Sequence, residues 1–534
     1  MKSIKKFLAV ILSMTLMLTL GTATFGAQKT LPSGKDTGSI NVTNLKPGDT
    51  VTAYQFVKAN YNEYGFTGYS AINNYVKDPV APTAQEVIDM ASNAATMTVA
   101  EKKVATGDTE VTLNGLPVGY YLVMVTSGSE TVYSPMIAGI YYSKSATDNT
   151  LTNGAISADS DFEIKAQKCW AKSSTPKLEK TIVTPSSKNS KGDDIAIGGK
   201  ITFNLSATVP SYSKEYKKVT YKIYDIMSEG LDYVDGSMKC FIEKYENNRE
   251  NIKVTPKVNG GIIEITFDSK FILEHPGQKI QVEYQAKLNE KAGVNFDANI
   301  NKAYLEYSNN PASGSTAKTG EDKVYVYTFG IDSNLFGKST EKWNEKTKEL
   351  IKVEEGEYQW VETEKESGIF TTTTALEGAT FTLTNNKTKK SYTATSDKYG
   401  YLKFTGLDAG EYTLQETDAP DGFTLNDAKH TVVITAEYNQ DGTLKSYTIK
   451  IDDKATSTYT ATYDKGVIKT ITSTKDSQGN ISESAILKNS KMSFLPSTGG
   501  VGTTIFAIVG VVFVAVALGL HMILRGKSKL EQDR

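Results

Sequence analysis

The chain has 534 residues, and its 59 Lys and Arg nearly balance its 61 Asp and Glu, so the formal net charge is only -2. This balance gives no electrostatic case for binding nucleic acid. Three His and two Cys leave little material for a metal site or a thiol nucleophile, so we predict neither a metal nor a cofactor. A chain of this length holds about three domains once its end segments are set aside.

The N-terminus has the pattern of an export signal. A short basic segment precedes an apolar stretch from Phe7 to Leu20, and small residues follow it through Ala27. This order is typical of a secretory signal peptide, and the apolar stretch is short for a membrane span. We therefore predict that residues 1–27 are a signal peptide and that the chain is exported.

The residue pattern in the interior of the chain predicts β-strands. Thr, Tyr, Val and Ile alternate with polar residues in segments such as 200–205, 261–267 and 430–434. Turn residues separate these segments at short intervals, as β-sandwiches require. The clearest helical period lies at residues 82–95. We predict an all-β fold of tandem immunoglobulin-like sandwiches in an elongated rod.

Short polar segments that contain Pro suggest the domain boundaries. Residues 172–176 form a polar, Pro-containing joint, and residues 309–315 form either a long turn or a linker. The strand at 323–328 would close the second domain. The predicted domains are an N-terminal β-rich domain at 28–172, a middle sandwich at 173–328 and a C-terminal sandwich at 329–491.

The C-terminal end carries a composite signal. An uncharged apolar run at 503–524 is long enough for one membrane helix, and the basic tail at 525–534 would stay on the cytoplasmic side. The pentapeptide before this run is Leu495, Pro496, Ser497, Thr498 and Gly499. The arrangement resembles the LPxTG cell-wall sorting signal of Gram-positive surface proteins, which sortases cut between Thr and Gly. The resemblance implies a temporary membrane tether and a mature protein that ends at Thr498.

Three further motifs extend the resemblance: residues 376–383 (LEGATFTL), 410–423 (GEYTLQETDAPDGF) and 301–311 (NKAYLEYSNNP). With the sorting signal, they resemble the backbone, or major shaft, pilins of Gram-positive bacteria. The first two resemble collagen-adhesin (Cna) B-type domains, and the second resembles the pilin E-box. The third is similar to the end of the middle domain of such pilins. The resemblance implies Cna-type sandwiches in the middle and C-terminal domains.

The domains of that family carry internal Lys–Asn isopeptide bonds, which act as covalent staples. The formation of such a bond has physical requirements. A Lys amine is nucleophilic only when neutral, and burial lowers its pKa. A neighbouring carboxyl, kept protonated by the same burial, polarises the Asn amide and shuttles protons. Ammonia leaves and no cofactor is needed. Each site thus requires a Lys, an Asn and an Asp or Glu in one core.

The middle domain contains a full set by resemblance. Lys180 on its first strand matches the bonding Lys, Asn301 on its last strand matches the bonding Asn, and Asp225 matches the catalytic acid. Spacing alone favours a plainer interpretation, in which Lys180 faces solvent, Asn301 lies in a turn and Asp225 caps the next segment. The resemblance favours the bond.

The C-terminal domain has an incomplete match. Glu416 fits the E-box acid and Asn489 fits the last-strand Asn. Leu335 stands where the family usually places the Lys, and the nearest Lys is Lys338. Either the strand carries an insertion and Lys338 forms the bond, or this domain lacks one. The N-terminal domain shows no assignable triad.

Polymerisation of such pilins requires an internal Lys that attacks the acyl-enzyme formed at Thr498 of another subunit. The family motif is an aromatic residue followed by Pro, Lys and Asn, and this chain departs from it in residues 168–174 (KCWAKSS). We predict Lys172 as the linking residue, with Lys168 and Lys177 as alternatives. The plainer interpretation of Lys172 is an exposed linker residue.

The two cysteines give little information about the fold or the function. Cys169 and Cys240 could pair outside the cell, although a secreted protein that depends on disulfides would use more of them.

Two other functional classes were weighed. A wall-anchored adhesin that is not polymerised would display a ligand-binding N-terminal domain, and the aromatic-rich stretch at 54–75 is a candidate face. Aromatic residues in strands more often belong to the core. A surface enzyme has little support, because no Ser-His-Asp arrangement, metal cluster or carboxylate pair stands out.

We therefore predict a non-enzymatic structural protein whose only chemistry is autocatalytic isopeptide formation. It would be the subunit of a covalent, cell-wall-anchored pilus shaft that supports adhesion. The expected partners are pilus-specific and housekeeping sortases, identical subunits joined by Lys–Thr linkages, minor or tip pilins, and peptidoglycan.

Overall fold

The computed structural model describes most of residues 31–488. The described residues are 31–107, 109–128, 130–143, 155–156, 162–183, 189–245, 248–331, 336–339, 348–354, 357–363, 370–374, 377–397, 402–452, 455–474 and 485–488. The predicted signal peptide (1–27), sorting pentapeptide (495–499), tether helix (503–524) and basic tail (525–534) lie outside them. Within the described residues, neither α-helix has the length and apolar character that a membrane span requires.

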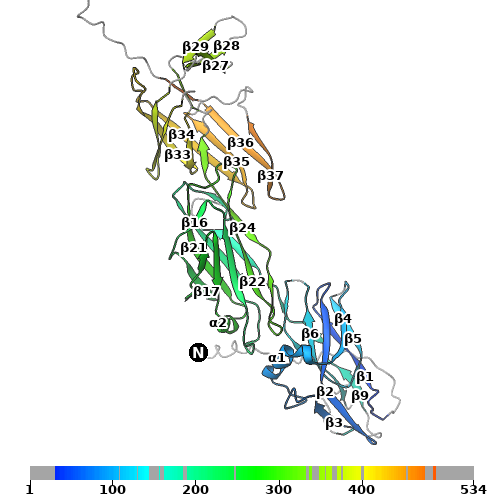
Figure 1. Cartoon of the computed structure of the whole chain (residues 1–534). Helices are drawn as coiled ribbons and strands as arrows, with labels where there is room; N and C mark the ends of the chain where they lie inside the picture. The colour runs from blue at the N-terminus through cyan, green and yellow to red at the C-terminus, as the bar shows by residue number, and fades with distance from the viewer. Residues whose placement is uncertain are drawn as a thin grey trace, which may run out of the picture.

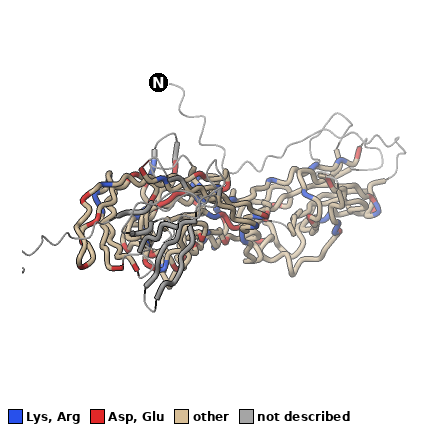
Figure 2. The backbone as a smooth tube through the Cα atoms, turned by 90° about the horizontal axis from the view of Figure 1, so that it is seen from above, with Lys and Arg blue, Asp and Glu red and all other residues tan. Residues whose placement is uncertain are grey.

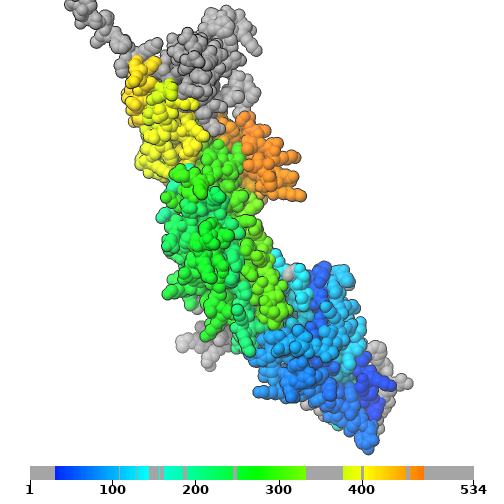
Figure 3. Space-filling view, viewed as in Figure 1, coloured from blue at the N-terminus to red at the C-terminus, as the bar shows by residue number. Residues whose placement is uncertain are grey.

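Three β-rich domains follow one another along an elongated molecule (Figures 1 and 3). The predicted all-β rod is confirmed. Basic and acidic residues are interspersed over the described parts of the rod, as Figure 2 shows, in keeping with the near-zero net charge.

The N-terminal domain contains two main sheets and most of the helical residues. Its elements are β1 (Thr37–Thr43), β2 (Thr50–Asn62), β3 (Gly65–Ala71), α1 (Ala84–Ser92), η1 (Ala94–Thr96), β4 (Val99–Val104), β5 (Glu110–Pro117), β6 (Gly119–Thr126), β7 (Val132–Tyr133), β8 (Met136–Ser143), β9 (Glu163–Ala166), β10 (Cys169–Trp170) and β11 (Ser173–Ser174). The larger sheet has the order β3-β2-β6-β8-β9, and the smaller has the order β10-β1-β5.

Helix α1 confirms the helical period of the sequence and has a clear start signal. The Thr83 side chain accepts a hydrogen bond from the Glu86 backbone N–H, and the Thr83 backbone N–H donates one to the Glu86 carboxylate, which is a complete capping box. Val87 and Met90 point from the helix into a second apolar cluster with Leu122 of β6. The helix therefore covers one face of the larger sheet.

The middle domain is a sandwich of two sheets. Its elements are β12 (Leu178–Ile182), β13 (Gly192–Asp194), β14 (Lys200–Thr208), β15 (Tyr221–Met227), β16 (Leu231–Tyr233), β17 (Lys239–Tyr245), β18 (Asn248–Ile252), β19 (Lys257–Asn259), β20 (Ile262–Thr266), α2 (Ser269–Glu274), β21 (Lys279–Leu288), β22 (Asn299–Asn310), β23 (Ser315–Lys318) and β24 (Asp322–Tyr327). One sheet has the order β12-β14-β21-β17-β18 and the other has the order β13-β24-β22-β15-β20-β19.

Strict alternation builds the core of this sandwich. Strand β15 buries every second residue, as does the first half of β22, so one face of each strand packs against the opposite sheet. Asn301 lies on β22, and β23 and β24 follow in the same sheet. Asn301 is therefore not on the last strand of the domain, although the sequence resemblance had predicted that position.

The C-terminal domain is built around one broad antiparallel sheet. Its elements are β25 (Phe329–Ile331), β26 (Phe336–Ser339), β27 (Lys348–Glu354), β28 (Glu357–Thr363), β29 (Phe370–Thr374), β30 (Thr380–Asn385), β31 (Ser391–Thr395), β32 (Phe404–Leu407), β33 (Gly410–Asp418), β34 (Lys429–Tyr438), β35 (Leu444–Ile451), β36 (Ala455–Asp464), β37 (Val467–Thr474) and β38 (Ala485–Lys488). The broad sheet has the order β31-β30-β33-β34-β35-β36-β37.

The joint between the first two domains is packed. Strand β11 pairs with β7 of the N-terminal domain, and β12 then opens the middle sandwich. The turn at 310–315 joins β22 to β23, so it is a turn and not a linker. Ala312 in this turn packs against the apolar cluster under α1, and the Tyr307 hydroxyl donates to the Glu130 carbonyl.

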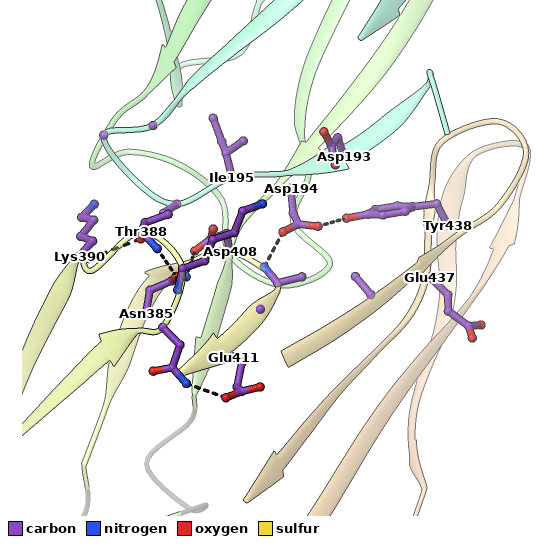
Figure 4. Close-up of a pocket in the computed structure, with 18 of the residues that line it drawn as sticks. Asp193, Asp194, Ile195, Asn385, Thr388, Lys390, Asp408, Glu411, Glu437 and Tyr438 are labelled. Atoms are coloured by element: carbon purple, nitrogen blue, oxygen red, sulfur yellow. Dashed lines mark hydrogen bonds between the residues drawn. The ribbon is translucent and has the colours of Figure 1, made fainter. Parts of the chain in front are cut away.

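The joint between the second and third domains is also packed. Tyr325 and Tyr327 of β24 belong to the apolar core of the C-terminal domain. The Leu444 backbone N–H donates to the Tyr327 hydroxyl at 2.9 Å. Figure 4 shows the pocket at this junction, where Asp194 accepts from the Tyr438 hydroxyl at 2.6 Å and from the Ala409 backbone N–H. These contacts restrict bending of the rod at the junction.

Candidate functional site: a buried Lys–Asp–Asn cluster in the middle domain

A charged cluster lies in the middle of an otherwise apolar sandwich. Lys180, Asp225 and Asn301 each have a relative exposure of 0%. Charged side chains are almost never fully buried unless they are paired. Two such charged residues and a buried amide, on strands far apart in sequence, mark a specific site.

Strand register explains why these residues meet. Lys180 is on β12, opposite Leu205 of β14, in one sheet. Asp225 is on β15 and Asn301 on β22, which are neighbouring strands of the other sheet, with Met227 opposite Asn301. Side chains two residues apart point to the same face, so Asp225 lies on the same inner face as Met227. The lysine therefore reaches across the sandwich toward the amide and the carboxyl.

The polar contacts of the cluster are short and directional. Lys180 Nζ donates to Asp225 Oδ2, and it lies 5.0 Å from the centroid of the Phe203 ring. Asn301 Oδ1 is buried without a hydrogen-bond partner. An unpaired buried acceptor costs free energy, so the unreacted cluster is not a relaxed core.

Burial controls the charge of the lysine. Desolvation lowers the pKa of Lys180, while the neighbouring Asp225 carboxyl opposes that shift. A lower pKa favours the neutral amine, which is the nucleophilic form. The plainer interpretation of these residues as a solvent-facing Lys, a turn Asn and a capping Asp does not hold, since all three are in the core.

A set of hydrogen bonds at the edge of the sandwich holds β12, the strand that carries Lys180, in place. The Lys180 backbone N–H donates to Asp322 Oδ2 at 2.6 Å, and Lys191 Nζ donates to the same oxygen at 2.6 Å. Lys191 Nζ also donates to the Lys180 carbonyl at 2.6 Å. The first strand is thereby fixed to the start of β24. Lys191 and Asp322 belong to no motif, so the sequence did not mark them as part of the site.

Tyr284 is the other residue that sequence reasoning missed. Its hydroxyl lies 3.2 Å from Lys180 Nζ, donates to Asp225 Oδ1 at 2.7 Å, and accepts from Asn301 Nδ2 at 2.7 Å. One signal was available, because alternation in β21 places Tyr284 on the buried face. A buried tyrosine hydroxyl needs a polar partner, but only the fold shows which one.

The second predicted set, in the C-terminal domain, is only partly described. Glu416 is buried, with an exposure of 2%, and its Oε2 accepts from the Asn426 backbone N–H at 2.8 Å. Lys338 lies in β26, which runs parallel to β38 and pairs Lys338 with Leu487. Asn489 and Leu335 lie outside the described residues.

The candidate linking lysines are all exposed. Lys168 precedes β10, Lys172 lies between β10 and β11, and Lys177 precedes β12. The backbone around Lys172 is held in place: its carbonyl accepts from the Ser134 N–H at 3.0 Å, and the preceding carbonyl of Ala171 accepts from Asn44 Nδ2 at 2.7 Å.

The two cysteines do not pair. Cys169 is in the N-terminal domain and Cys240 is in the middle domain, and both are buried and free. Burial raises the pKa of each thiol to about 12. Among the described residues, no group of three or more His, Cys, Asp and Glu side chains is arranged to hold a metal ion.

Comparison with known proteins supports the sequence interpretation in three regions. Residues 35–173 match the model of the T6 antigen Ig-like domain, and residues 359–452 match that of the SpaA prealbumin-like fold domain. Residues 488–529 match the LPXTG cell-wall anchor motif. The chain is also 26% identical to the trypsin-resistant surface T6 protein of Streptococcus pyogenes serotype M6, over 93% of this chain and 96% of that protein.

The chain is a relative of the LPXTG-anchored backbone pilins. The predicted resemblance and the predicted location at the cell wall are thereby confirmed. The fold is similar to that of the T6 backbone pilin of serotype M6 Streptococcus pyogenes, with a TM-score of 0.58 and 20% identity, over 86% of this chain and all of that one.

Proposed function

We propose that this pilin relative is the shaft subunit of a covalently polymerised, wall-anchored pilus. The surface T6 protein and the T6 backbone pilin structure, which it resembles along most of its length, support this function. The rod of three packed domains and the cell-wall anchor motif at its C-terminal end fit the same role. The mechanical part of the proposal rests on one observation. Three fully buried residues lie together in the middle domain: Lys180, Asp225 and Asn301.

In the middle domain, Lys180 and Asn301 would form an isopeptide bond. The neutral Nζ attacks the Asn301 side-chain carbonyl carbon, a C–N amide bond forms, and the original amide nitrogen leaves as ammonia. Asp225, which touches Nζ through Oδ2, takes up and returns protons. The net composition changes by one ammonia, so neither an oxidant nor a cofactor is required.

Such a bond would have a direct mechanical effect. It would join β12 of one sheet to β22 of the other, near the two ends of the middle domain's sequence. Tension applied along the rod would pass through the bond and leave most of the strands between these two residues unloaded. The chain could not lengthen past a covalent bridge before that bridge broke.

In the C-terminal domain, Lys338 and Asn489 would form the second bond with Glu416 as the promoting acid. The parallel pairing of β26 and β38 supports this assignment, because it brings the Lys338 strand alongside the strand that leads to Asn489. The low exposure of Glu416 is what a promoting acid requires.

Assembly would use Lys172 as the amine and Thr498 as the acyl donor. A pilus-specific sortase would join Lys172 of one subunit to Thr498 of the next, and a housekeeping sortase would transfer the finished shaft to peptidoglycan. Minor or tip pilins would complete the fibre. Exposure of Lys172 on a hydrogen-bonded backbone supports this choice over a buried lysine.

The non-polymerised adhesin has less structural support. In the aromatic stretch of the N-terminal domain, Phe56 and Phe66 are in the core and Tyr64, with an exposure of 70%, is the strongly exposed member. These residues do not form one exposed aromatic face.

The test of shaft assembly is a polymerisation assay with single variants. Cells that express the protein with its pilus sortase should give a high-molecular-weight ladder that survives boiling in detergent. Lys172→Ala should abolish the ladder, whereas Lys168→Ala and Lys177→Ala should leave it. A single wall-linked band from the unchanged protein would contradict the shaft function and support the adhesin.

The test of the staples is the intact mass of residues 28–498 made in a recombinant host. Each isopeptide bond removes one ammonia, about 17 Da. Two losses would support both bonds, and one loss mapped to Lys180–Asn301 would leave the C-terminal domain without one. An unchanged mass in a folded sample would contradict the staple proposal.

A further inference from the structure

Tyr284 occupies a fixed place between the reacting groups. It lies on β21, opposite Phe203 of β14, and is fully buried. Its ring packs against the rings of Phe203 and Tyr233, with centroid separations of 5.5 and 5.9 Å. This packing limits the movement of the hydroxyl, which is the one polar atom of the side chain.

The hydrogen bonds of Tyr284 have a defined direction. A tyrosine hydroxyl has one proton, and Tyr284 gives it to Asp225 Oδ1 at 2.7 Å. The hydroxyl oxygen must therefore accept from Asn301, which requires the amide NH2 group, Nδ2, to face it at 2.7 Å. Nδ2 is the nitrogen that leaves as ammonia in the proposed reaction.

Asp225 makes no hydrogen bond with that leaving nitrogen in the described structure. Its Oδ2 faces Lys180 Nζ and its Oδ1 faces the Tyr284 hydroxyl. The hydrogen bonds of Asp225 in the described structure do not include one to Asn301. A proton that moves from the carboxyl to the departing nitrogen therefore has a continuous path through one intermediate group, the phenol.

We propose that Tyr284 is a catalytic proton relay for isopeptide formation between Lys180 and Asn301. The inference rests on the proposed function of this cluster and goes beyond it, because it assigns a fourth residue that contacts the reacting atoms. The relay carries a proton from Asp225 Oδ1 to Asn301 Nδ2 as the bond between Nδ2 and the side-chain carbonyl carbon breaks.

The protons balance in this scheme. The buried ion pair first becomes a neutral amine and a neutral carboxyl by transfer of one proton from Nζ to Asp225. After Nζ attacks, the neutral carboxyl of Asp225 turns its proton to the Tyr284 oxygen, and the Tyr284 hydroxyl turns its own proton from Asp225 to Nδ2. Tyr284 then gives its proton to Nδ2 and takes that of Asp225, while Asp225 takes a proton from the attacking nitrogen. Ammonia leaves, Tyr284 regains its proton, and Asp225 ends as the neutral carboxyl that it became in the first transfer.

The environment of the phenol suits a relay better than a base. Burial raises the pKa of Tyr284 well above its ordinary value, and the nearby Asp225 adds to the shift. The phenol therefore stays protonated in the resting cluster. A hydroxyl in that state can donate and accept in one concerted step without carrying a lasting charge.

The experiment compares the rate of bond formation in Tyr284→Phe and in the unchanged protein. Each is made as residues 28–498 in a cell-free reaction, quenched in acid at increasing times, and the fraction with the Lys180–Asn301 bond is read from peptide mass. Phenylalanine keeps the ring and removes only the hydroxyl. Proton relays contribute on the order of a hundredfold or more in rate, so we expect at least a tenfold slower reaction.

A matched control comes from the same sandwich. Tyr221 is as deeply buried as Tyr284, and its hydroxyl makes no hydrogen bond in the structure. Tyr221→Phe should form the bond at the unchanged rate. Equal rates in Tyr284→Phe and the unchanged protein would overturn the relay. Absence of the bond in the unchanged protein would instead overturn the proposed staple.

A second measurement separates chemistry from folding. Circular dichroism and a melting curve show whether Tyr284→Phe folds. If it does not, 3,5-difluorotyrosine at position 284 keeps the hydroxyl and makes it more acidic. A relay predicts a rate that changes with phenol acidity, at least about threefold. A folded fluorinated protein that reacts at the unchanged rate would also overturn the proposal.

Discussion

Gly192 of the middle domain and Gly442 of the C-terminal domain touch through their backbones. A Cβ atom on Gly192 would stand 2.2 Å from the Gly442 carbonyl oxygen, and one on Gly442 would stand 2.2 Å from the Lys191 carbonyl oxygen. Nearby, Asn189 Nδ2 donates to the Asn439 carbonyl at 2.5 Å. The two domains therefore fit together at a point where no side chain has room.

Gly442→Ala should open this junction. The residue has a φ of +89°, so alanine adds backbone strain as well as a clash. Small-angle scattering should show a larger spread of interdomain angles, and the C-terminal domain should melt separately from the middle one. Gly422→Ala is the matched control, because Gly422 has a φ of +84° and open space around its Cβ position. Similar scattering from both variants would contradict the prediction.

The junction should also be sensitive to pH through Asp194. Burial raises its pKa to about 6, above the ordinary value of about 3.9. Between these two values the folded protein binds more protons at this site than the unfolded chain does, so the contribution of Asp194 to stability falls as pH rises from about 4 to about 6. Below pH 4 that contribution is fully present.

The Asp194→Asn variant removes the titrating carboxyl and tests the direction of this pH dependence of stability. The melting temperature of the unchanged protein minus that of Asp194→Asn should decrease as pH rises from 4 to 7. The exposed Asp232 offers a control, since Asp232→Asn should give a difference that does not follow this trend. A constant difference for Asp194→Asn across the range would show that the carboxyl does not titrate there.

Asn301→Ala should lower stability while leaving the Lys180–Asp225 pair in place. The isopeptide bond would close a loop of about 120 residues, and a cross-link of that span contributes about 4–5 kcal/mol by the chain-entropy model. We expect the middle domain to melt about 10 °C lower or more, with the 17-Da loss absent. Lys302→Ala, which removes an exposed ion pair with Glu321, should change stability by less than about 1 kcal/mol. Equal melting curves for the two variants would contradict a bond at Asn301.

Lys338→Ala should remove one of two mass losses. If Lys338 bonds Asn489, the variant of residues 28–498 retains a single loss of about 17 Da, which maps to the middle domain. Lys348→Ala, which changes a lysine in β27, the next strand along the chain, should keep both losses. A single loss in the unchanged protein would show that Lys338 does not form a bond.

The two cysteines should react only when the protein unfolds. With a pKa of about 12, each thiol is ionised to about one part in ten thousand at pH 8. A thiol reagent should therefore label neither Cys169 nor Cys240 in the native protein and should label both in guanidinium chloride. Rapid labelling of the native protein, or a mass lower by two hydrogens, would contradict the free, buried thiols of the structure.

Much of the architecture was predictable because local patterns agreed with the fold. Alternating residues marked strands that the structure confirms, such as β14, β20 and β34, and the helical period at residues 82–95 marked α1. Periodicity reports which face of an element is buried. It does not report which other element covers that face.

The candidate site was predictable in its residues but not in its geometry. Lys180, Asp225 and Asn301 were chosen by resemblance, and spacing alone favoured exposed positions for them. Their burial depends on the pairing of β12 with β14 and of β15 with β22. Register of this kind arises from contacts between distant segments, which no short window of sequence contains.

By itself, the sequence determined the predicted order of the parts: an export signal, strand-rich domains and a wall-sorting signal, each predicted from contiguous residues whose hydropathy or chemistry acts locally. Only the tertiary structure decided that Tyr284 stands between Asp225 and Asn301, that Cys169 and Cys240 lie apart, and that Gly192 meets Gly442. The physical reason is that these relationships come from the packing of one sheet on another and of one domain on the next. Packing depends on three-dimensional register, whereas signals and strands depend on neighbours along the chain.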